Sequence, residues 1–203
     1  MDSAQTSAIA ARDRILRAAA QEFAEHGFSG ARINRIAEAA GANKQLIYHY
    51  FGSKEGIYAE VLQEMLTTLR STADWREGLG SLLRNQSGSN ADSQRAWARM
   101  VAWEGLAGES PVVSRANRQA SIDRQIMAVA ELQSAGNLAP DLNPRFVLAT
   151  IYAIATAPYV MPQLVDFCLG AGASKSGDTM TMWADFVERL FGNGWPDAPD
   201  ATP

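Results

Sequence analysis

Apolar residues recur every three or four positions along most of this 203-residue chain, and runs that alternate apolar and polar residues are absent. The first spacing places apolar side chains on one face of an α-helix, whereas a half-buried β-strand requires the second. The sequence therefore predicts an all-α fold. A hydrophobic fraction of 47% and a charged fraction of 20% fit a globular protein, and a chain of this length can bury a core without disulfide bonds.

The apolar periodicity is interrupted by glycine, proline and short polar stretches, which divide the chain into helices. The predicted helices span residues 10–26, 33–40, 44–51, 54–73, 94–107, 112–135, 143–169 with a break at its prolines, and 178–191. We expect residues 10–56 to form a small helical domain and residues 57–192 a larger one. Both ends, residues 1–9 and 193–203, are expected to be disordered.

Residues 146–165 carry no charged side chain and are about as long as a membrane-spanning helix. Because this segment contains Pro158 and Pro162 and lacks a basic flank, we expect a buried, broken helix and no membrane association. Cys168, the only cysteine, excludes an intrachain disulfide and is predicted to be a small buried hydrophobe. The first residues lack a signal-peptide pattern, so we expect a cytoplasmic protein.

The short helices at 33–40 and 44–51 form a predicted hairpin. Ala37 is small enough for the helices to cross closely, Gly41 tolerates the positive φ of a sharp turn, and Asn43 is a suitable N-cap. The second helix is then expected to expose Lys44, Gln45, Tyr48 and His49. Such a face is either simply solvated or a surface for phosphates and base edges, and the hairpin alone leaves both readings open.

Charge gives only a weak indication of the partner. The net charge of −4 does not by itself suggest nucleic acid. Residues 1–56 hold seven Lys or Arg and six Asp or Glu, whereas the rest of the chain holds 11 and 16. The hairpin therefore lies in the more basic part of the chain.

The hairpin belongs to a longer ungapped motif. Its elements are Gly27-Phe28, Ile36-Ala37, Ala40-Gly41, Tyr48-His49-Tyr50-Phe51 and Ser53-Lys54-Glu55. With this motif, the region from about Ile9 to Leu66 resembles the TetR family of bacterial transcriptional regulators. The resemblance implies an N-terminal three-helix, helix-turn-helix DNA-binding domain, followed by a larger helical domain for ligand binding and dimerisation.

The same resemblance implies a set of DNA-contacting residues. They are Arg32, Asn43, Lys44, Gln45, Tyr48, His49, Tyr50 and Lys54. Tyr48 and Tyr50 resemble residues that contact backbone phosphates, and Lys54 resembles the family's phosphate-binding lysine at a helix N-terminus.

Two positions differ from the family pattern. Where the family commonly has Thr or Ser at the start of the second helix, this chain has Ala31-Arg32, so Arg32 is expected to replace a hydroxyl contact with a cation. Where the family favours a small residue, this chain has Gln45. At the start of the recognition helix, Gln45 is expected to read adenine, and Lys44 to read guanine or to bind a phosphate.

The resemblance further implies a homodimer formed by the last two helices, which would read an imperfectly palindromic double-stranded operator. On the final helix, the expected contact residues are Met182, Phe186, Val187 and Leu190. Candidate contacts for an unidentified small-molecule effector are Trp97, Met100, Trp103, Glu104, Met127 and Tyr152. The same residue types also form ordinary cores. Glu104 would either meet a cationic ligand or pair with Arg99 or another arginine.

We therefore expect a sequence-specific regulator that represses transcription in response to a ligand. One alternative keeps the fold but makes the protein a DNA-bound adaptor that recruits a protein partner without a ligand. A helical enzyme is the other alternative. The sequence contains no P-loop, dinucleotide fingerprint, H-E-x-x-H, G-x-S-x-G or Cys/His cluster, so we expect no enzyme activity, no cofactor and no metal.

Overall fold

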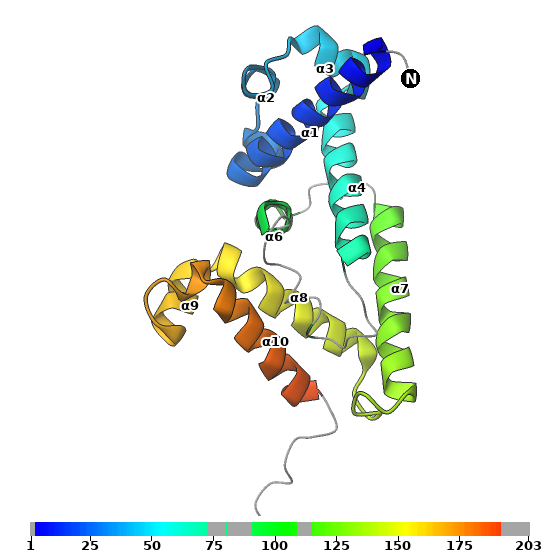
Figure 1. Ribbon diagram of the computed structural model, residues 1–203, viewed down its shortest axis with the longest axis vertical. Helices are drawn as coiled ribbons and strands as arrows, with labels where there is room; N and C mark the ends of the chain where they lie inside the picture. The colour runs from blue at the N-terminus through cyan, green and yellow to red at the C-terminus, as the bar shows by residue number, and fades with distance from the viewer. Residues whose placement is uncertain (1–2, 73–79, 81–90, 109–114, 192–203) are drawn as a thin grey trace, which may run out of the picture. The chain divides into compact units, whose positions relative to one another are not determined.

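The computed structural model describes residues 3–72, 80, 91–108 and 115–191 (Figure 1). Within these residues the regular structure is helical and no strand is found, so the all-α prediction is confirmed. The chain forms two compact units. Unit 1 contains residues 1–69 and 92–118, and unit 2 contains residues 70–91 and 119–203.

Unit 1 is built mainly from five helices. They are α1 (Ser3–Gly30), α2 (Ile33–Ala39), α3 (Lys44–Phe51), α4 (Lys54–Thr72) and α6 (Ala91–Leu106). Helix α1 begins before the expected start at residue 10, so residues 3–9 are helical where disorder was expected. The reason is local, since four of the residues from Ser3 to Ala11 are alanine, which has the highest helix propensity.

The core of unit 1 joins helices that the predicted domain boundary at residue 56 had separated. Its fully buried side chains include Ile15, Phe23, Ile36, Ile47, Ile57, Leu62 and Met100. They come from α1, α2, α3, α4 and α6, and they form one apolar cluster. The predicted boundary does not coincide with this unit, because the hairpin alone has too little apolar surface and shares its core with α4 and α6.

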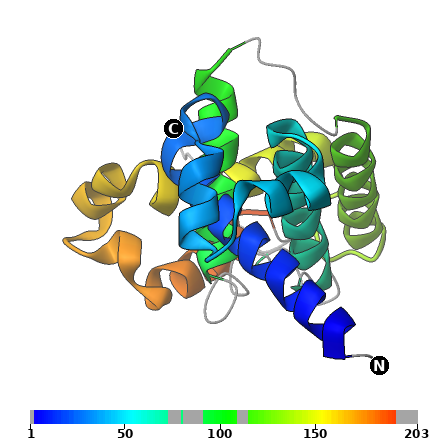
Figure 2. The same cartoon turned by 90° about the horizontal axis from the view of Figure 1, so that it is seen from above.

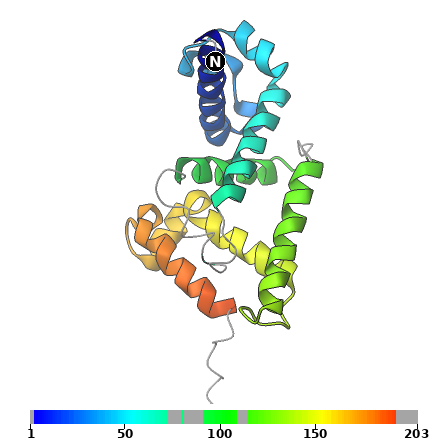
Figure 3. The ribbon, with the colours of Figure 1, turned by 45° about the vertical axis from the view of Figure 1, so that its right-hand side comes forward.

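Unit 2 contains most of α7 (Arg115–Ser134), then α8 (Pro144–Val160), α9 (Pro162–Leu169), a short 3-10 helix η3 (Ala173–Lys175) and α10 (Gly177–Phe191). Helices α8 and α10 run side by side (Figures 1 and 3). Val129 of α7, Val147 and Ile151 of α8, and Ala184 and Val187 of α10 form its buried apolar cluster together with Leu132 and Leu138.

The uncharged segment is a broken helix, as predicted. Helix α8 ends at Val160, and α9 continues from Pro162 at a bend of 97°. Within the described residues no single helix has the length and apolar character to cross a membrane, although this bent pair passes that test when taken together. Cys168, predicted to be buried, is exposed, because the short α9 buries only Val165.

Candidate nucleic-acid interface

The turn between α2 and α3 has the predicted geometry. Gly41 has a φ of 60°, a conformation that glycine adopts without the steric cost of a side chain. Asn43 caps α3 by accepting a hydrogen bond on Oδ1 from the Leu46 backbone N–H at 2.8 Å. Ala37 and Ile47 are buried in the same core. Figure 2 shows these helices from above. The predicted hairpin is therefore confirmed.

Helix α3 presents a polar face to solvent. Lys44, Gln45, Tyr48 and His49 are exposed, and Tyr48 exposes 48% of its surface. They form two adjacent rows, because residues four apart lie one above the other on a helix. Tyr50 is half-buried, with its ring centroid 5.6 Å from that of His49. This face offers a cation, an amide and a phenolic hydroxyl, the groups that bind phosphates and base edges.

The start of α4 fixes Lys54 beside the connection between α1 and α2. Ser53 caps the helix by accepting a hydrogen bond on Oγ from the Gly56 N–H at 3.1 Å. The Lys54 Nζ donates to the Ser29 carbonyl oxygen at 3.4 Å and lies 4.8 Å from the Phe28 ring centroid. The ammonium is therefore held near the C-terminal end of α1, while the backbone of Lys54 begins α4, where unpaired N–H groups favour an anion.

The start of α2 uses a carboxylate in place of the missing hydroxyl cap. Arg32 makes no side-chain cap, and its backbone N–H donates to the Glu22 Oε1 at 2.8 Å. The same carboxylate accepts from the Arg35 Nε at 2.8 and 3.0 Å, and the Arg35 Nη2 lies 2.6 Å from Oε1. Burial alone would raise the pKa of Glu22, but the bonds from Arg35 and from the Arg32 N–H hold it below its usual value.

Glu22 and Arg35 are absent from the predicted site, although the sequence contained a signal for one of them. Glu22 follows Ala19 by three residues and Ile15 by seven, so it lies on the apolar face of the first helix. A carboxylate on such a face needs a partner. The partner on α2 is not deducible from local spacing.

Among the described cations up to residue 56, three remain available for phosphates. In the part of the chain that the structure describes, no hydrogen bond or ion pair is found for the side chains of Arg17, Arg32 and Lys44, which are all exposed. By contrast, Arg12 pairs with Glu60 at 2.5 Å. Arg32 and Lys44 belong to the predicted DNA-contact set, whereas Arg17 does not.

Helix α6 contacts both α1 and α4. The Arg99 Nε and the Trp103 Nε1 donate to the Ala24 carbonyl oxygen at 3.1 and 3.2 Å. The Tyr58 hydroxyl donates to the Glu104 Oε1 at 3.0 Å, and burial, with the charge of Glu104 second, raises the pKa of this tyrosine. Glu104 pairs with Arg118 at 2.7 Å.

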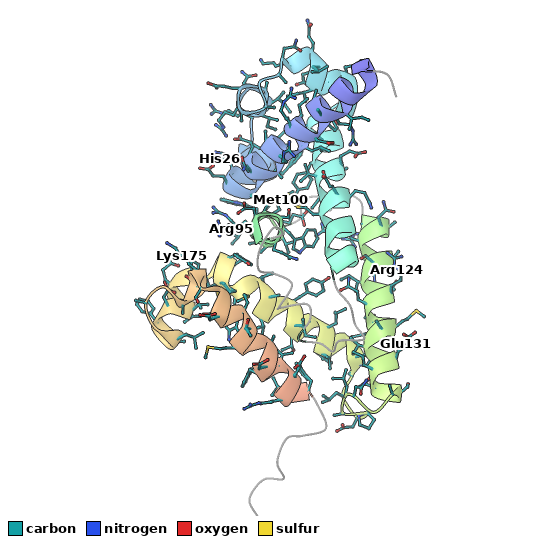
Figure 4. The ribbon with its side chains drawn as sticks, in the orientation of Figure 1. His26, Arg95, Met100, Arg124, Glu131 and Lys175 are labelled. Carbon is teal, nitrogen blue, oxygen red and sulfur yellow. The ribbon has the colours of Figure 1, made fainter. Side chains whose placement is uncertain are left out.

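The six candidate effector contacts are divided between the two units. Met100, which is labelled in Figure 4, and Trp97 are buried in the core of unit 1. Trp103 and Glu104 line a pocket of about 260 Å³ in the same unit, together with His26, Phe28, Tyr58 and neighbouring residues. In unit 2, Met127 is 63% exposed, and Tyr152 is hydrogen-bonded to Gln125. The described residues contain no group of three or more His, Cys, Asp or Glu side chains that could hold a metal ion.

Comparison with known families gives two matches. The family model described as bacterial regulatory proteins, tetR family, matches residues 15–61. The model described as tetracyclin repressor-like, C-terminal domain, matches residues 90–189. The first match contains the hairpin and the start of α4, and the second covers nearly all of the chain from α6 to α10.

Curated relatives and solved structures agree with these matches. The HTH-type transcriptional repressor SCO4008 of Streptomyces coelicolor is 34% identical over 168 residues, covering 80% of this chain and 85% of the relative. The HTH-type transcriptional regulator RutR of Escherichia coli is 31% identical over 159 residues, covering 73% and 74%. The crystal structure of the putative transcriptional regulator SCO4942 from Streptomyces coelicolor superposes with a TM-score of 0.69 at 30% identity, covering 89% of this chain and 97% of the other. The chain therefore belongs to the TetR family of DNA-binding transcriptional regulators.

Proposed function

We propose that this protein is a cytoplasmic, ligand-responsive repressor that binds a palindromic operator as a homodimer. The observation that carries the proposal is the polar face of α3, where Lys44, Gln45 and Tyr48 are exposed to solvent. A repressor of this kind acts where chromosomal DNA is accessible, which is the basis for the location. Relatives whose names identify them as repressors support the direction of regulation.

Within the DNA site, Lys44 and Gln45 lie in the first turn of α3, the end of a recognition helix that enters the major groove. Gln45 is expected to make a bidentate contact with adenine, and Lys44 to contact guanine or a phosphate. Arg32, Tyr48, Tyr50 and Lys54 are expected to contact the backbone, with Asn43 and His49 beside them.

The experiment is selection of genomic fragments bound by the full chain, followed by fluorescence anisotropy on the enriched sequence. We expect an imperfect palindrome. Gln45→Ala should relax preference at one base position in each half-site, whereas Lys44→Ala should weaken binding by about tenfold or more. Lys175→Ala, which removes an exposed cation from η3, serves as the control and should leave binding unchanged. A site without symmetry, or full affinity in both α3 variants, contradicts the proposal.

The proposed dimer surface, here called the α8–α10 face, consists of Phe146, Val160, Met182 and Phe186. Phe146 is 74% exposed, Met182 67% and Phe186 50%. Exposed apolar groups on two adjacent helices are typical of an interface. Val187, one of the expected contact residues, is instead fully buried in the core of unit 2.

A charged substitution tests this surface. Phe186→Glu should convert a dimer into a monomer in light scattering coupled to gel filtration, because an unpaired carboxylate would be buried at the interface. Leu106→Glu is the matched control, since Leu106 of α6 is 80% exposed and lies outside the α8–α10 face. Retention of the dimer by the Phe186 variant contradicts this assignment.

Regulation by a small molecule is the last part of the proposal. Ligand response is typical of this family, and Tyr152 remains the candidate contact in unit 2 that offers a hydrogen-bonding group from a half-buried position. Trp103 and Glu104 remain candidates at the pocket of unit 1.

A further inference from the structure

The core face of α7 changes from apolar to polar along its length. Val129 and Leu132 pack into the apolar cluster of unit 2. Gln125 and Ser121 precede Val129 by four and eight residues, so they continue the same face of the helix. Ser121 is only 3% exposed. Arg124 lies on the outward side, exposed to solvent (Figure 4). Two neutral polar side chains thus occupy positions where the helix otherwise buries apolar ones.

Gln125 contacts Tyr152 of α8, and Ser121 lies one helical turn before Gln125 on α7. The Tyr152 hydroxyl donates to the Gln125 Oε1 at 3.0 Å, and the Gln125 Nε2 donates weakly to the Ser121 carbonyl oxygen at 3.4 Å. Burial raises the pKa of Tyr152, although the bond to Gln125 lowers it, so the phenol is a neutral donor near pH 7.

The polar cluster formed by Ser121, Gln125 and Tyr152 has hydrogen-bonding groups that the bonds above do not use. The Ser121 Oγ is buried and has no partner in the part of the chain that the structure describes. One N–H of Gln125 and a lone pair of Tyr152 are also unused by the bonds found there. Because a buried hydroxyl without a partner costs free energy, its presence points to a group that completes it.

The surroundings define the chemistry of that group. Among the described residues of unit 2, the buried polar side chains are those of Ser121 and Thr179, and no charged side chain is buried. A buried ion without an opposite charge would be strongly disfavoured. A group that both donates and accepts hydrogen bonds would match the serine hydroxyl, the glutamine N–H and the tyrosine oxygen.

We propose that Ser121, Gln125 and Tyr152 form the polar part of the effector site and bind an uncharged donor–acceptor group such as a carboxamide. This inference rests on the proposed ligand response and specifies its ligand class. Gln125 and Ser121 position such a group from α7, and Tyr152 does so from α8.

Matched probes test the class on the full-length protein. Each of three rings, cyclohexane, benzene and naphthalene, is tested as the carboxamide, the carboxylate and the aminomethyl cation, so that size and charge vary separately. At about ten times its Kd, a binding carboxamide should raise the Tm by ~3–6 °C. The carboxylate and the cation of the same ring should raise it by less than a third as much. Failure of all three carboxamides, or an equal effect of a charged partner, overturns the inference.

Two variants test whether the carboxamide binds at the polar cluster. Gln125→Met should abolish the carboxamide shift, whereas Gln119→Met, an exposed glutamine of the same helix, should preserve it. Ser121→Ala should raise the Tm of the ligand-free protein by ~2–4 °C, because it removes a buried unpaired hydroxyl, and should weaken carboxamide binding at least threefold. A Tm that falls in Ser121→Ala, or a carboxamide shift that survives Gln125→Met, contradicts the assignment.

Operator binding, measured separately by anisotropy, distinguishes this inference from the proposed function. A carboxamide that binds through the cluster without weakening operator binding supports the site but contradicts ligand-responsive repression. Intact operator binding with no carboxamide bound contradicts the site and leaves the DNA-binding proposal standing.

Discussion

Gly27 is a position in unit 1 where a single methyl group should have a large effect on stability. It has φ 66° and ψ 176°, a conformation essentially confined to glycine. A Cβ built there would lie 3.0 Å from the Trp103 Cδ2. The chain thus needs glycine at residue 27 both for its backbone and for the approach of α6.

The cost of Gly27→Ala follows from these two requirements. Occupying this backbone region costs a non-glycine residue about 1–3 kcal/mol. Moving the indole would weaken the hydrogen bond from the Trp103 Nε1 to Ala24, worth about 0.5–1.5 kcal/mol. We expect a loss of about 2–4 kcal/mol in unfolding free energy, or a fall in Tm of ~4–16 °C. Gly27→Asn should be no better, because asparagine tolerates left-handed helical angles but not a ψ near 180°.

The assay is calorimetry and urea denaturation of both variants against Gly105→Ala. Gly105 lies in α6, and a Cβ there would meet nothing within 4 Å. That substitution should stabilise the protein by about 0.5–1 kcal/mol, because alanine loses less backbone entropy in a helix. If Gly27→Ala is as stable as the wild type, neither the backbone angle nor the indole contact constrains residue 27.

Three further predictions concern the hairpin. Because the folded-state pKa of Glu22 is lowered, its stabilising contribution is present above the usual pKa of 4.5 and is lost as the pH falls through the folded value. Acid titration followed by circular dichroism should therefore show a shallower loss of stability in Glu22→Gln. Arg32→Ala should reduce the salt slope of operator binding by about 0.9, as for one lost phosphate contact, whereas Arg35→Ala should mainly lower stability because that guanidinium already binds Glu22. Asn43→Ala should cost about 1 kcal/mol in urea denaturation through loss of the α3 cap, and the exposed Asn34→Ala should cost nothing; equal effects would contradict the capping role.

Local rules were enough to predict the hairpin. The positive φ of Gly41 and the cap at Asn43 involve only residues within a few positions, so spacing specified them. The resemblance to the TetR family then indicated that the hairpin binds DNA, a function that the hairpin alone did not specify. Of the expected contacts on α3, all but the half-buried Tyr50 lie on the exposed polar face.

Contacts between residues that are distant in the sequence explain what could not be predicted from it. Arg99 binds the carbonyl of Ala24, 75 positions earlier, and no periodicity reports such a pairing. For the same reason, the sequence did not reveal that α6 packs against α1. Trp97 and Met100 show a second limit of prediction from sequence. A core and a ligand pocket use the same residue types, so only the packing in the structure distinguishes one from the other.

The pairing of Glu22 bears on how a chain with a net charge of −4 would bind DNA. Glu22 is turned inward onto Arg35, and its charge is compensated there. It also accepts the backbone N–H of Arg32, the N-cap residue of α2, and its negative charge makes that helix start less favourable for a phosphate. We therefore expect the exposed guanidinium of Arg32 to make the phosphate contact. Helix α3 itself contains Lys44 and no acidic residue. We therefore expect affinity for DNA to depend on which charges remain unpaired near α2 and on α3, because screening by salt limits the influence of the acidic remainder to short range.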